Sequence, residues 1–473
     1  MNRQLWFLLI GIGFFLSSCS LAPKYTQPQA PIPVQWPQGE AYGNGSAVNQ
    51  TMTVSELSLK EFFTDPKLQK VIETALTNNR DLRLAVLNVE RVRALYDIQK
   101  FDLLPTVNVV GSGSKQRVPA DLSATGKSMT MEQYGVNLGI ASWEIDFFGR
   151  IRSLKDRALE EYLATDEARC SAQIALVSEV ARVYLTLASD LENLKLVQST
   201  LKAQQASYSL IHKRYEIGIA TEIDLYRAQT RVDAALRDVP RFTQLTAQDK
   251  NALNLLAGSP VPEDILPKDL SSISPFKEIS PGLSSDTILT RPDIMAAEHR
   301  LKGAYAYIGA ARAAFFPRIS LTTSVGTASD ELSGLFNSGS GTWNFAPQIA
   351  MPIFDARTWA ALRVSKTDQK IVLTQYEKAI QTAFREVADA LAVQGTINQQ
   401  ISAQQSLVNA TEKTYHLSNK RYTVGVDGYL SVLDAQRSHY AQQQVLIGLR
   451  LAGLANQVRL YAVLGGGSVH SLE

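Results

Sequence analysis

Four segments of the chain alternate apolar residues with small or polar ones, and this period of two predicts β-strands. The clearest pair flanks a Gly/Ser-rich gap: residues 319–325 form one segment, and every second residue from Trp343 to Ile353 is apolar in the other. The same pattern occurs at Val107 and Val109 and again at 134–141. Segments of about ten residues with one apolar face are typical of membrane-spanning strands. The pattern therefore predicts two β-hairpins, at 106–142 and 319–353.

Four spanning strands are too few to close a barrel by themselves. The smallest single-chain bacterial barrels have about eight strands, and an open sheet edge in lipid leaves backbone groups without hydrogen-bond partners. If the hairpins cross a membrane, several chains must share one barrel.

The rest of the chain has helical periodicity over unusually long stretches. Helical patterning covers 65–103, 150–213 and 222–256, and the second of these contains neither Pro nor Gly. Apolar residues recur there at alternating steps of three and four, which is coiled-coil spacing. The members of this seam are Val177, Val180, Tyr184, Leu187, Leu191 and Leu194. A helix of that length would reach roughly 95 Å. Since these stretches carry many charged residues, they must project into water.

The plan occurs twice along the chain. Tyr215-x-x-Gly218 matches Tyr422-x-x-Gly425, and the second long stretch carries a seam of the same kind that Gln394 and Gln404 interrupt. The members of that second seam are Leu373, Tyr376, Ile380, Ala383, Val387, Ala390, Ile397, Ile401 and Val408. The predicted organisation is a signal peptide (1–18), an extended arm (19–64), a first repeat (65–258), a Pro/Ser-rich connector (259–285), a second repeat (286–467) and a tail (468–473). Each repeat consists of a helix, a β-hairpin, a long helix, a turn and a helix.

The N-terminus has the pattern of a bacterial lipoprotein signal. Arg3 precedes an apolar run that ends at Leu16-Ser-Ser-Cys19, so Cys19 is the expected lipidated first residue of the mature chain. An ordinary signal peptide is the alternative. The other cysteine, Cys170, falls on the apolar seam and is expected to be a buried hydrophobe.

Composition and motifs argue against several classes of function. The net charge of +2 and a charged fraction of 19% give no indication of nucleic-acid binding. The five His lack metal-ligand spacing, the glycine-rich stretches lack the Lys-Ser/Thr of a phosphate loop, and no nucleophile–base pair stands out. We therefore predict a protein that is not an enzyme and carries no cofactor other than the covalent lipid on Cys19.

Several motifs, in order and duplicated, resemble those of the outer-membrane efflux protein family, the TolC-like exit ducts, and within it the lipidated OprM-type branch. The matching segments begin with Leu16–Cys19 and cover nearly the whole chain. They also include 78–82, 143–150, 281–283 with 291–294, 309–317, 376–384, 421–422 and 433–437.

The resemblance implies an α+β membrane protein. Its internally duplicated long helices would form a coiled-coil α-barrel, and two β-hairpins per chain would form a transmembrane β-barrel shared in a homotrimer. The implied partners are a periplasmic adaptor protein, an inner-membrane pump of the resistance-nodulation-division (RND) type and the lipid of the outer membrane.

Two sets of residues around the helix-breaking turns are candidates for a working role. The turns at Gly218 and Gly425 suit a sharp reversal through the freedom of glycine at positive φ. In the family these turns meet the adaptor, so the expected contacts are Ile217, Gly218, Ile219, Val424, Gly425 and Val426. The structural explanation alone is sufficient for the two glycines.

The second set follows the second turn. Leu430 and Asp434 lie four residues apart and therefore share a helix face. In a three-fold duct, rings of Leu and Asp would narrow and charge the entrance. The predicted periplasmic gate comprises Leu430, Asp434, Arg437, Arg421, Tyr422 and Asp427. The alternative is that Asp434 is a solvated helix residue and Leu430 part of a helix–helix contact.

The function that these observations favour is the passive outer-membrane exit channel of a tripartite multidrug efflux system. The expected location is the outer membrane, with a lipid anchor and a helical part in the periplasm. The alternatives are the duct of a type I protein secretion system and a rod-like structural lipoprotein, although the rod leaves the amphipathic hairpins without a purpose.

Overall fold

The computed structural model describes residues 20–42, 57–279 and 284–466, which form two compact units. The first unit comprises 20–29, Asn88–Thr165 and Ala296–Tyr376, and the second comprises the remaining described residues. The predicted signal peptide, Cys19, the motif at 281–283 and the tail at 468–473 lie outside the described residues. Helices α5 (Arg150–Glu216) and α8 (Ala356–Thr423) begin in the first unit and end in the second.

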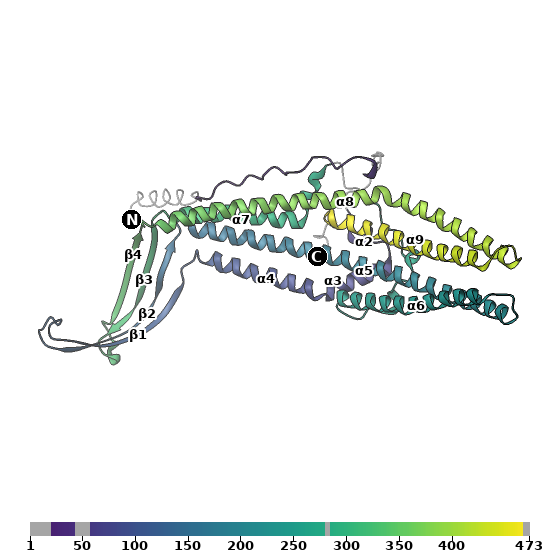
Figure 1. The fold of residues 1–473 in the computed structure, drawn as a ribbon. Coiled ribbons are helices and arrows are strands. Elements are labelled where there is room, and N and C mark those ends of the chain that lie inside the picture. The colour runs from purple at the N-terminus through teal and green to yellow at the C-terminus, as the bar shows by residue number, and fades with distance from the viewer. Residues whose placement is uncertain (1–19, 43–56, 280–283, 467–473) are drawn as a thin grey trace. The chain divides into compact units, whose positions relative to one another are not determined.

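One four-stranded antiparallel sheet dominates the first unit (Figure 1). Its strands are β1 (Val107–Val118), β2 (Met129–Ile145), β3 (Arg318–Ser329) and β4 (Gly341–Ala350), in sequence order across the sheet. The two predicted hairpins are present. The pairing of β2 with β3 joins the two repeats in one sheet, a contact between residues nearly 200 positions apart in sequence.

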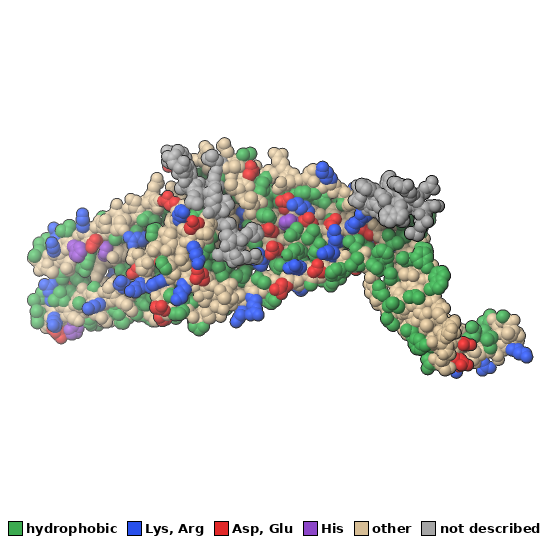
Figure 2. Space-filling view, turned by 180° about the vertical axis from the view of Figure 1, so that it is seen from behind, with side chains coloured by type: hydrophobic (Ala, Val, Ile, Leu, Met, Phe, Trp, Pro, Cys, Tyr) green, Lys and Arg blue, Asp and Glu red, His purple; other side chains and the backbone are tan. Residues whose placement is uncertain are grey.

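The register separates an apolar face of the sheet from a polar one. Leu321 lies opposite Pro347, and Val325 opposite Trp343. Directly opposite side chains point to the same face, so these residues form an apolar surface, and Trp343 in it is 77% exposed. The intervening positions of β3 and β4 carry mainly Ser, Thr, Gln and Asn. Figure 2 shows hydrophobic side chains spread along the sheet, with charged side chains gathered at one end.

Strand β2 continues three residues beyond the predicted end of its hairpin, through a β-bulge. The register shifts between Ile140 and Trp143, and Ser142 adopts a φ of 57°. A bulge bends the strand and re-aims the side chains that follow it. Beyond the bulge Glu144 pairs with Ser320, which places its carboxylate on the polar face of the sheet.

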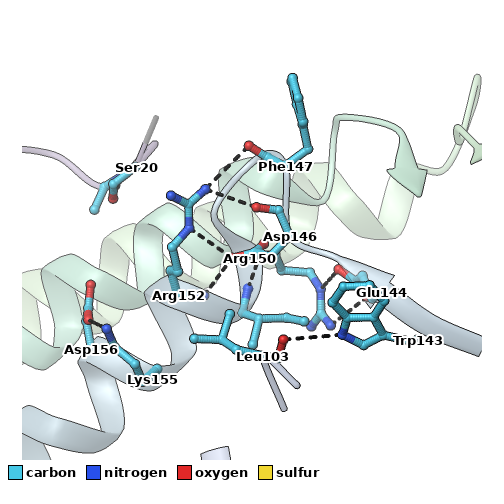
Figure 3. Close-up of polar contacts among 12 residues, drawn as sticks. Ser20, Leu103, Trp143, Glu144, Asp146, Phe147, Arg150, Arg152, Lys155 and Asp156 are labelled. Atoms are coloured by element: carbon cyan, nitrogen blue, oxygen red, sulfur yellow. Dashed lines mark hydrogen bonds and ion pairs between the residues drawn. The ribbon is translucent and has the colours of Figure 1, made fainter. Parts of the chain in front are cut away.

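Carboxylates join the end of β2 to the start of α5 (Figure 3). The Arg150 guanidinium donates to both oxygens of Glu144, over 2.8 and 2.9 Å. The Asp146 carboxylate accepts the backbone N–H groups of Ile151 and Arg152 at 3.1 and 2.9 Å. Since the first N–H groups of a helix have no partner within the helix, Asp146 acts as its cap.

The aromatic residues near the strand ends fall into two groups. Phe354, beyond the end of β4, is 91% exposed, whereas Phe345 lies in the middle of β4 and is 61% exposed. Phe148 instead stacks on Phe316, with ring centroids 4.9 Å apart. Some aromatic residues near the sheet are therefore exposed, and others pack on neighbouring rings.

The second unit is built from two long helical hairpins. One is α5 with α6 (Glu222–Ala257), and the other is α8 with α9 (Tyr429–Val463). The two seams predicted from the sequence supply much of its core. In α5, Val177, Val180, Tyr184 and Leu187 are buried, and in the part of α8 within this unit Ile380, Ala383, Val387, Ala390, Ile397 and Val408 are buried.

Shorter helices than α5 and α8 complete the described part of the chain. They are α2 (Leu59–Phe62), α3 (Pro66–Asn78), α4 (Arg80–Phe101), α7 (Pro292–Ala313) and the 3₁₀ turns Glu40–Tyr42, Glu263–Ile265, Leu270–Ser272, Ser285–Thr290 and Leu332–Gly334. Among the described residues, no helix is both long and apolar enough to cross a membrane.

The prediction of a single helix over 65–103 is wrong, because the helix is interrupted at Asn79. This residue has an extended ψ of 132° and is 5% exposed. Its side-chain oxygen accepts the N–H of Leu82, and its side-chain amide donates to the carbonyl of Leu256. Asn79 thus caps α4 and ties it to α6, a tertiary contact that helical periodicity does not reveal.

Arg291 is a buried arginine of the second unit whose guanidinium makes several hydrogen bonds and ion pairs. Its guanidinium donates to Asp293, to Glu386 of α8 at 3.0 Å and to the carbonyl of Val463 at the end of α9 at 2.8 Å. Its side chain is 10% exposed. One residue therefore joins the start of α7 to both helices of the second hairpin.

Candidate functional site at the helix-turn tips

Both helical hairpins reverse through the same backbone motif. At the first turn the N–H of Ile219 donates to the carbonyl of Arg214, and that of Gly218 to Tyr215. At the second turn Val426 and Gly425 make the equivalent bonds to Arg421 and Tyr422. This pattern is a Schellman motif, which requires a left-handed residue after the helix. Gly218 (φ 75°) and Gly425 (φ 79°) fill that position.

The two turns are completed differently. After the first, Thr221 and Asp224 form a capping box at the start of α6. After the second, Gly428 provides no side-chain cap for α9. The second turn instead contains an ion pair, in which the Arg421 guanidinium donates to both carboxylate oxygens of Asp427 over 2.6 and 2.9 Å.

The Arg421–Asp427 ion pair shifts the pKa of both side chains. The hydrogen bond from Arg421 holds the pKa of Asp427 below its usual value, and the same bond raises the pKa of the guanidinium. Asp427 is therefore ionised at neutral pH. Because both side chains lie at the surface, solvent screens the pair, and its effect is local to the turn.

A small hydrophobic cluster packs the two turns against each other. We define the tip cluster as Ile211 of α5, Ala228 of α6, and Tyr429, Val432 and Leu433 of α9. Partly buried residues of both hairpins surround it: Tyr208, Ala220, Leu225, Tyr415 and Tyr422. Figure 1 shows the α5–α6 and α8–α9 turns at the same end of this unit.

Aromatic contacts add to the cluster. The Tyr422 and Tyr429 rings lie 5.2 Å apart, and the Arg214 guanidinium lies over the Tyr422 ring at 4.9 Å. Burial raises the pKa of Tyr429 to about 12, so this phenol is neutral at physiological pH. Arg214 belongs to the first turn and Tyr422 to the second, which makes this cation–π contact a direct link between the repeats.

The apolar residues at the turns are exposed in the single chain. Ile217 and Ile219 are each 69% exposed, and Val424 and Val426 are 73% and 62% exposed. Four large aliphatic side chains at one end of the second unit form an apolar patch. Such a patch is typical of a surface that binds a partner.

Leu430 and Asp434 lie outside the tip cluster, on the exposed side of α9. Leu430 is 46% exposed, and the Asp434 side chain is 54% exposed. Arg437 approaches Asp434 at 3.5 Å. The single chain thus brings Asp434 and Arg437 together and leaves nearly half of Leu430 exposed. The gate role of these residues stays a prediction.

Sequence reasoning missed the residues that connect the two hairpins, namely Arg214 and the five members of the tip cluster. Each of them has an ordinary helical explanation in the sequence. A signal did exist: Val432, Leu433 and Ala435 follow the second turn as an apolar cluster, so one face of α9 needed a partner.

The described residues contain no group of three or more His, Cys, Asp or Glu side chains that could hold a metal ion. Cys170 is buried, and burial raises the pKa of its thiol. The contacts described at the tip site are packing surfaces, hydrogen bonds and an ion pair.

The fold and the duplicated sequence define a class of protein. Residues 71–259 and 283–466 match the model of the outer membrane efflux protein family. The chain belongs to this family, and its fold is that of the TolC-like outer-membrane channels.

Particular relatives agree with that assignment. The chain is 47% identical to the probable efflux pump outer membrane protein TtgC of Pseudomonas putida, covering 96% of this chain and 94% of that protein. It is 42% identical to the outer membrane protein OprJ of Pseudomonas aeruginosa, covering 96% and 94%. Among solved structures, the open state of the MtrE channel of Neisseria gonorrhoeae superposes with a TM-score of 0.85 at 37% identity, covering 95% of this chain and 98% of that one.

Proposed function

We propose that the protein is the outer-membrane exit channel of a tripartite efflux system driven by an RND-type pump, and a passive duct for drugs and other small toxic molecules. The proposal rests on two features that occur together in one chain. One is a β-sheet with one exposed apolar face, and the other is a pair of helical hairpins whose turns pack against each other. The names of the relatives, which are efflux pump outer membrane proteins, support it.

The sheet supports a shared barrel. Strands β1 and β4 are its edges, and β4 is exposed along nearly its whole length. Unpaired backbone groups at two edges are not tolerated in lipid, and three copies would supply twelve strands and pair every edge. A homotrimer is therefore part of the proposal.

The tips supply the proposed periplasmic contacts. The exposed patch of Ile217, Ile219, Val424 and Val426 would meet the adaptor protein, because a partner that covers it removes large apolar side chains from water. The pump supplies the energy, and the channel performs no chemistry. The lipid on Cys19, which lies outside the described residues, would anchor each chain in the outer membrane.

Leu430 and Asp434 would form the constriction of the duct. Both are exposed in the single chain and lie on one face of α9, so three copies around an axis would bring three leucines and three carboxylates together. Crowded carboxylates repel one another, which favours capture of cations or engagement with Arg437.

Single-channel conductance in planar bilayers tests the proposal. The wild-type protein should insert and conduct weakly, and the double variant Leu430→Ala/Asp434→Ala should conduct markedly more. The double variant Ile217→Ser/Val424→Ser, at the exposed tips, is a matched control and should leave conductance unchanged while weakening adaptor binding.

The other outcomes are distinguishable. Weak conductance in both the wild type and the Leu430→Ala/Asp434→Ala variant would support the channel and contradict the gate role of these two residues. Failure of the wild type to insert or conduct would reject the shared barrel and favour the rod-like lipoprotein.

A further inference from the structure

Two carboxyl groups meet between the helices of the first hairpin, away from the tips. The carboxyl groups of Asp190 of α5 and Asp249 of α6 lie within hydrogen-bonding reach of each other. Both residues are partly buried. Two ionised carboxylates have no hydrogen to share, so a hydrogen bond between them requires a proton on one of them.

A second observation points the same way. The Asp249 Oδ2 atom is buried and accepts no hydrogen bond from any other N–H or O–H group of the described residues. A buried acceptor without a donor is costly, and more so when it carries charge. A proton on Asp249 itself would turn this oxygen from an unpartnered acceptor into a donor toward the Asp190 carboxylate.

The two repeats differ at this place. With the offset of 207 residues that relates the turns, Asp190 corresponds to Ile397 and Asp249 to Asn456. The same offset aligns Glu179-Val180 with Glu386-Val387 before the pair and Leu253 with Leu460 after it. The Asn456 amide donates to the carbonyl of Ala390 at 3.0 Å, so the second hairpin has a neutral, hydrogen-bonded side chain at this position. Only the first repeat places two acids there.

The neighbouring charges are few. Arg182 of α5 acts on Asp249, and Arg241 of α6 acts on Asp190. Arg182 donates to both oxygens of Glu179 at 2.8 and 2.5 Å, so much of its charge is already matched. From α9, Tyr440 faces Arg241 and is neutral at physiological pH. These cations do not cancel the repulsion between the two carboxylates.

We propose that Asp190 and Asp249 form a site that binds one proton between α5 and α6, and that loss of this proton loosens the first hairpin while the second is unaffected. With the proton the two carboxyl groups attract through a hydrogen bond, and without it two negative charges face each other in a partly buried space. The site itself does not depend on the channel function proposed above.

The titration falls in an accessible range. Burial raises the pKa of Asp249 to about 6, and the charge of Asp190 adds to this effect. Burial also raises the pKa of Asp190. Because the folded state holds the proton more tightly than the unfolded chain, stability is highest at acid pH, falls as the pH rises from about 4 to about 6, and is level above that.

Infrared difference spectroscopy of the full-length protein in detergent tests the site. A protonated carboxyl band should disappear in the wild type as the pH rises, with a midpoint near 6. Asp249→Asn and Asp190→Asn should each abolish this titration. Asp249→Asn copies the residue found in the second hairpin, so it is expected to fold. The matched control Asp389→Asn removes a half-exposed carboxylate of α8 that pairs loosely with Arg459, and it should keep the band.

Thermal unfolding provides the second readout. The unfolding temperature of the wild type and of Asp389→Asn should fall between about pH 5 and pH 6, and that of Asp249→Asn should fall less. A wild type without a band titrating near pH 6, or a band that persists in both Asn variants, would overturn the proposal. Conductance bears only on the channel function, so the two proposals fail separately.

Discussion

Truncation of Leu433 to alanine tests the contact between the two helical hairpins. Leu433 is 2% exposed, and its cluster includes Ile211 and Ala228 of the other hairpin. Removing a buried leucine side chain costs about 2–5 kcal/mol, depending on how well the cavity collapses. With few layers of structure beyond the cluster, the tip can relax, so we expect a value near the lower end, about 3 kcal/mol.

Hydrogen–deuterium exchange of the backbone amides is the assay. If the turns open locally, a loss of about 3 kcal/mol corresponds to roughly a 150-fold faster exchange, since 1.4 kcal/mol is a factor of ten. The informative peptide is 211–222, because it belongs to the other hairpin and contains no substituted residue. Leu430→Ala is the matched control: the same change three residues away, at a side chain that is 46% exposed, should alter exchange little.

Two results would contradict this reasoning. Acceleration confined to 429–437 would mean that Leu433 stabilises only its own helix. Equal acceleration by Leu430→Ala and Leu433→Ala would mean that the burial of Leu433 does not decide the stability of the tip.

Three further predictions concern residues that hold the helical unit together. Arg291→Met should lower the free energy of unfolding by about 3–5 kcal/mol in denaturant titration, because Glu386 and the Val463 carbonyl lose a buried partner. A loss of less than about 1 kcal/mol would mean that Arg291 does not join α7 to the second helical hairpin. Gly425→Ala should destabilise its turn by about 1–2 kcal/mol, measured by local exchange, since no atom obstructs an added Cβ and the positive φ alone carries the cost. The pKa of Asp427 is lowered by Arg421, so the ion pair stabilises the second turn above about pH 4 and is lost as the pH falls below its folded pKa. Exchange at that turn, corrected for intrinsic rates, should rise at acid pH in the wild type and be insensitive to this change in Asp427→Asn.

The strands and long helices were predictable because each is encoded by a local period. Alternation in β3 and β4 and the seams of α5 and α8 depend only on which face of an element is apolar. The reversals were predictable for a similar reason, since Gly218 and Gly425 occupy a conformation that side chains disfavour. Asn79 shows the limit of that approach: no Pro or Gly lies nearby, and the break between α3 and α4 rests on the cap that Asn79 gives to Leu82 together with its hydrogen bond to Leu256 of α6.

The candidate site, too, was predictable from the sequence only in part. The exposed aliphatic residues of the turns and the spacing of Leu430 and Asp434 follow from the sequence. The partners of the tip residues do not: Arg421 binds Asp427 within its own turn, and Arg214 reaches across to Tyr422 of the other repeat. A periodic pattern states which face of a helix is apolar, but not which of several similar helices covers it.

The sequence by itself determined the duplicated plan, the kinds of element, the faces they bury and the family to which the chain belongs. Only the tertiary structure decided that the two β-hairpins pair through β2 and β3 into one sheet. It also decided that the turns of the two helical hairpins share one cluster, and that Asp190 faces Asp249. The physical reason is range: periodicity and turn chemistry act over a few residues, whereas these contacts join residues about 60 to 220 positions apart, and tertiary packing selects them among alternatives with the same local pattern.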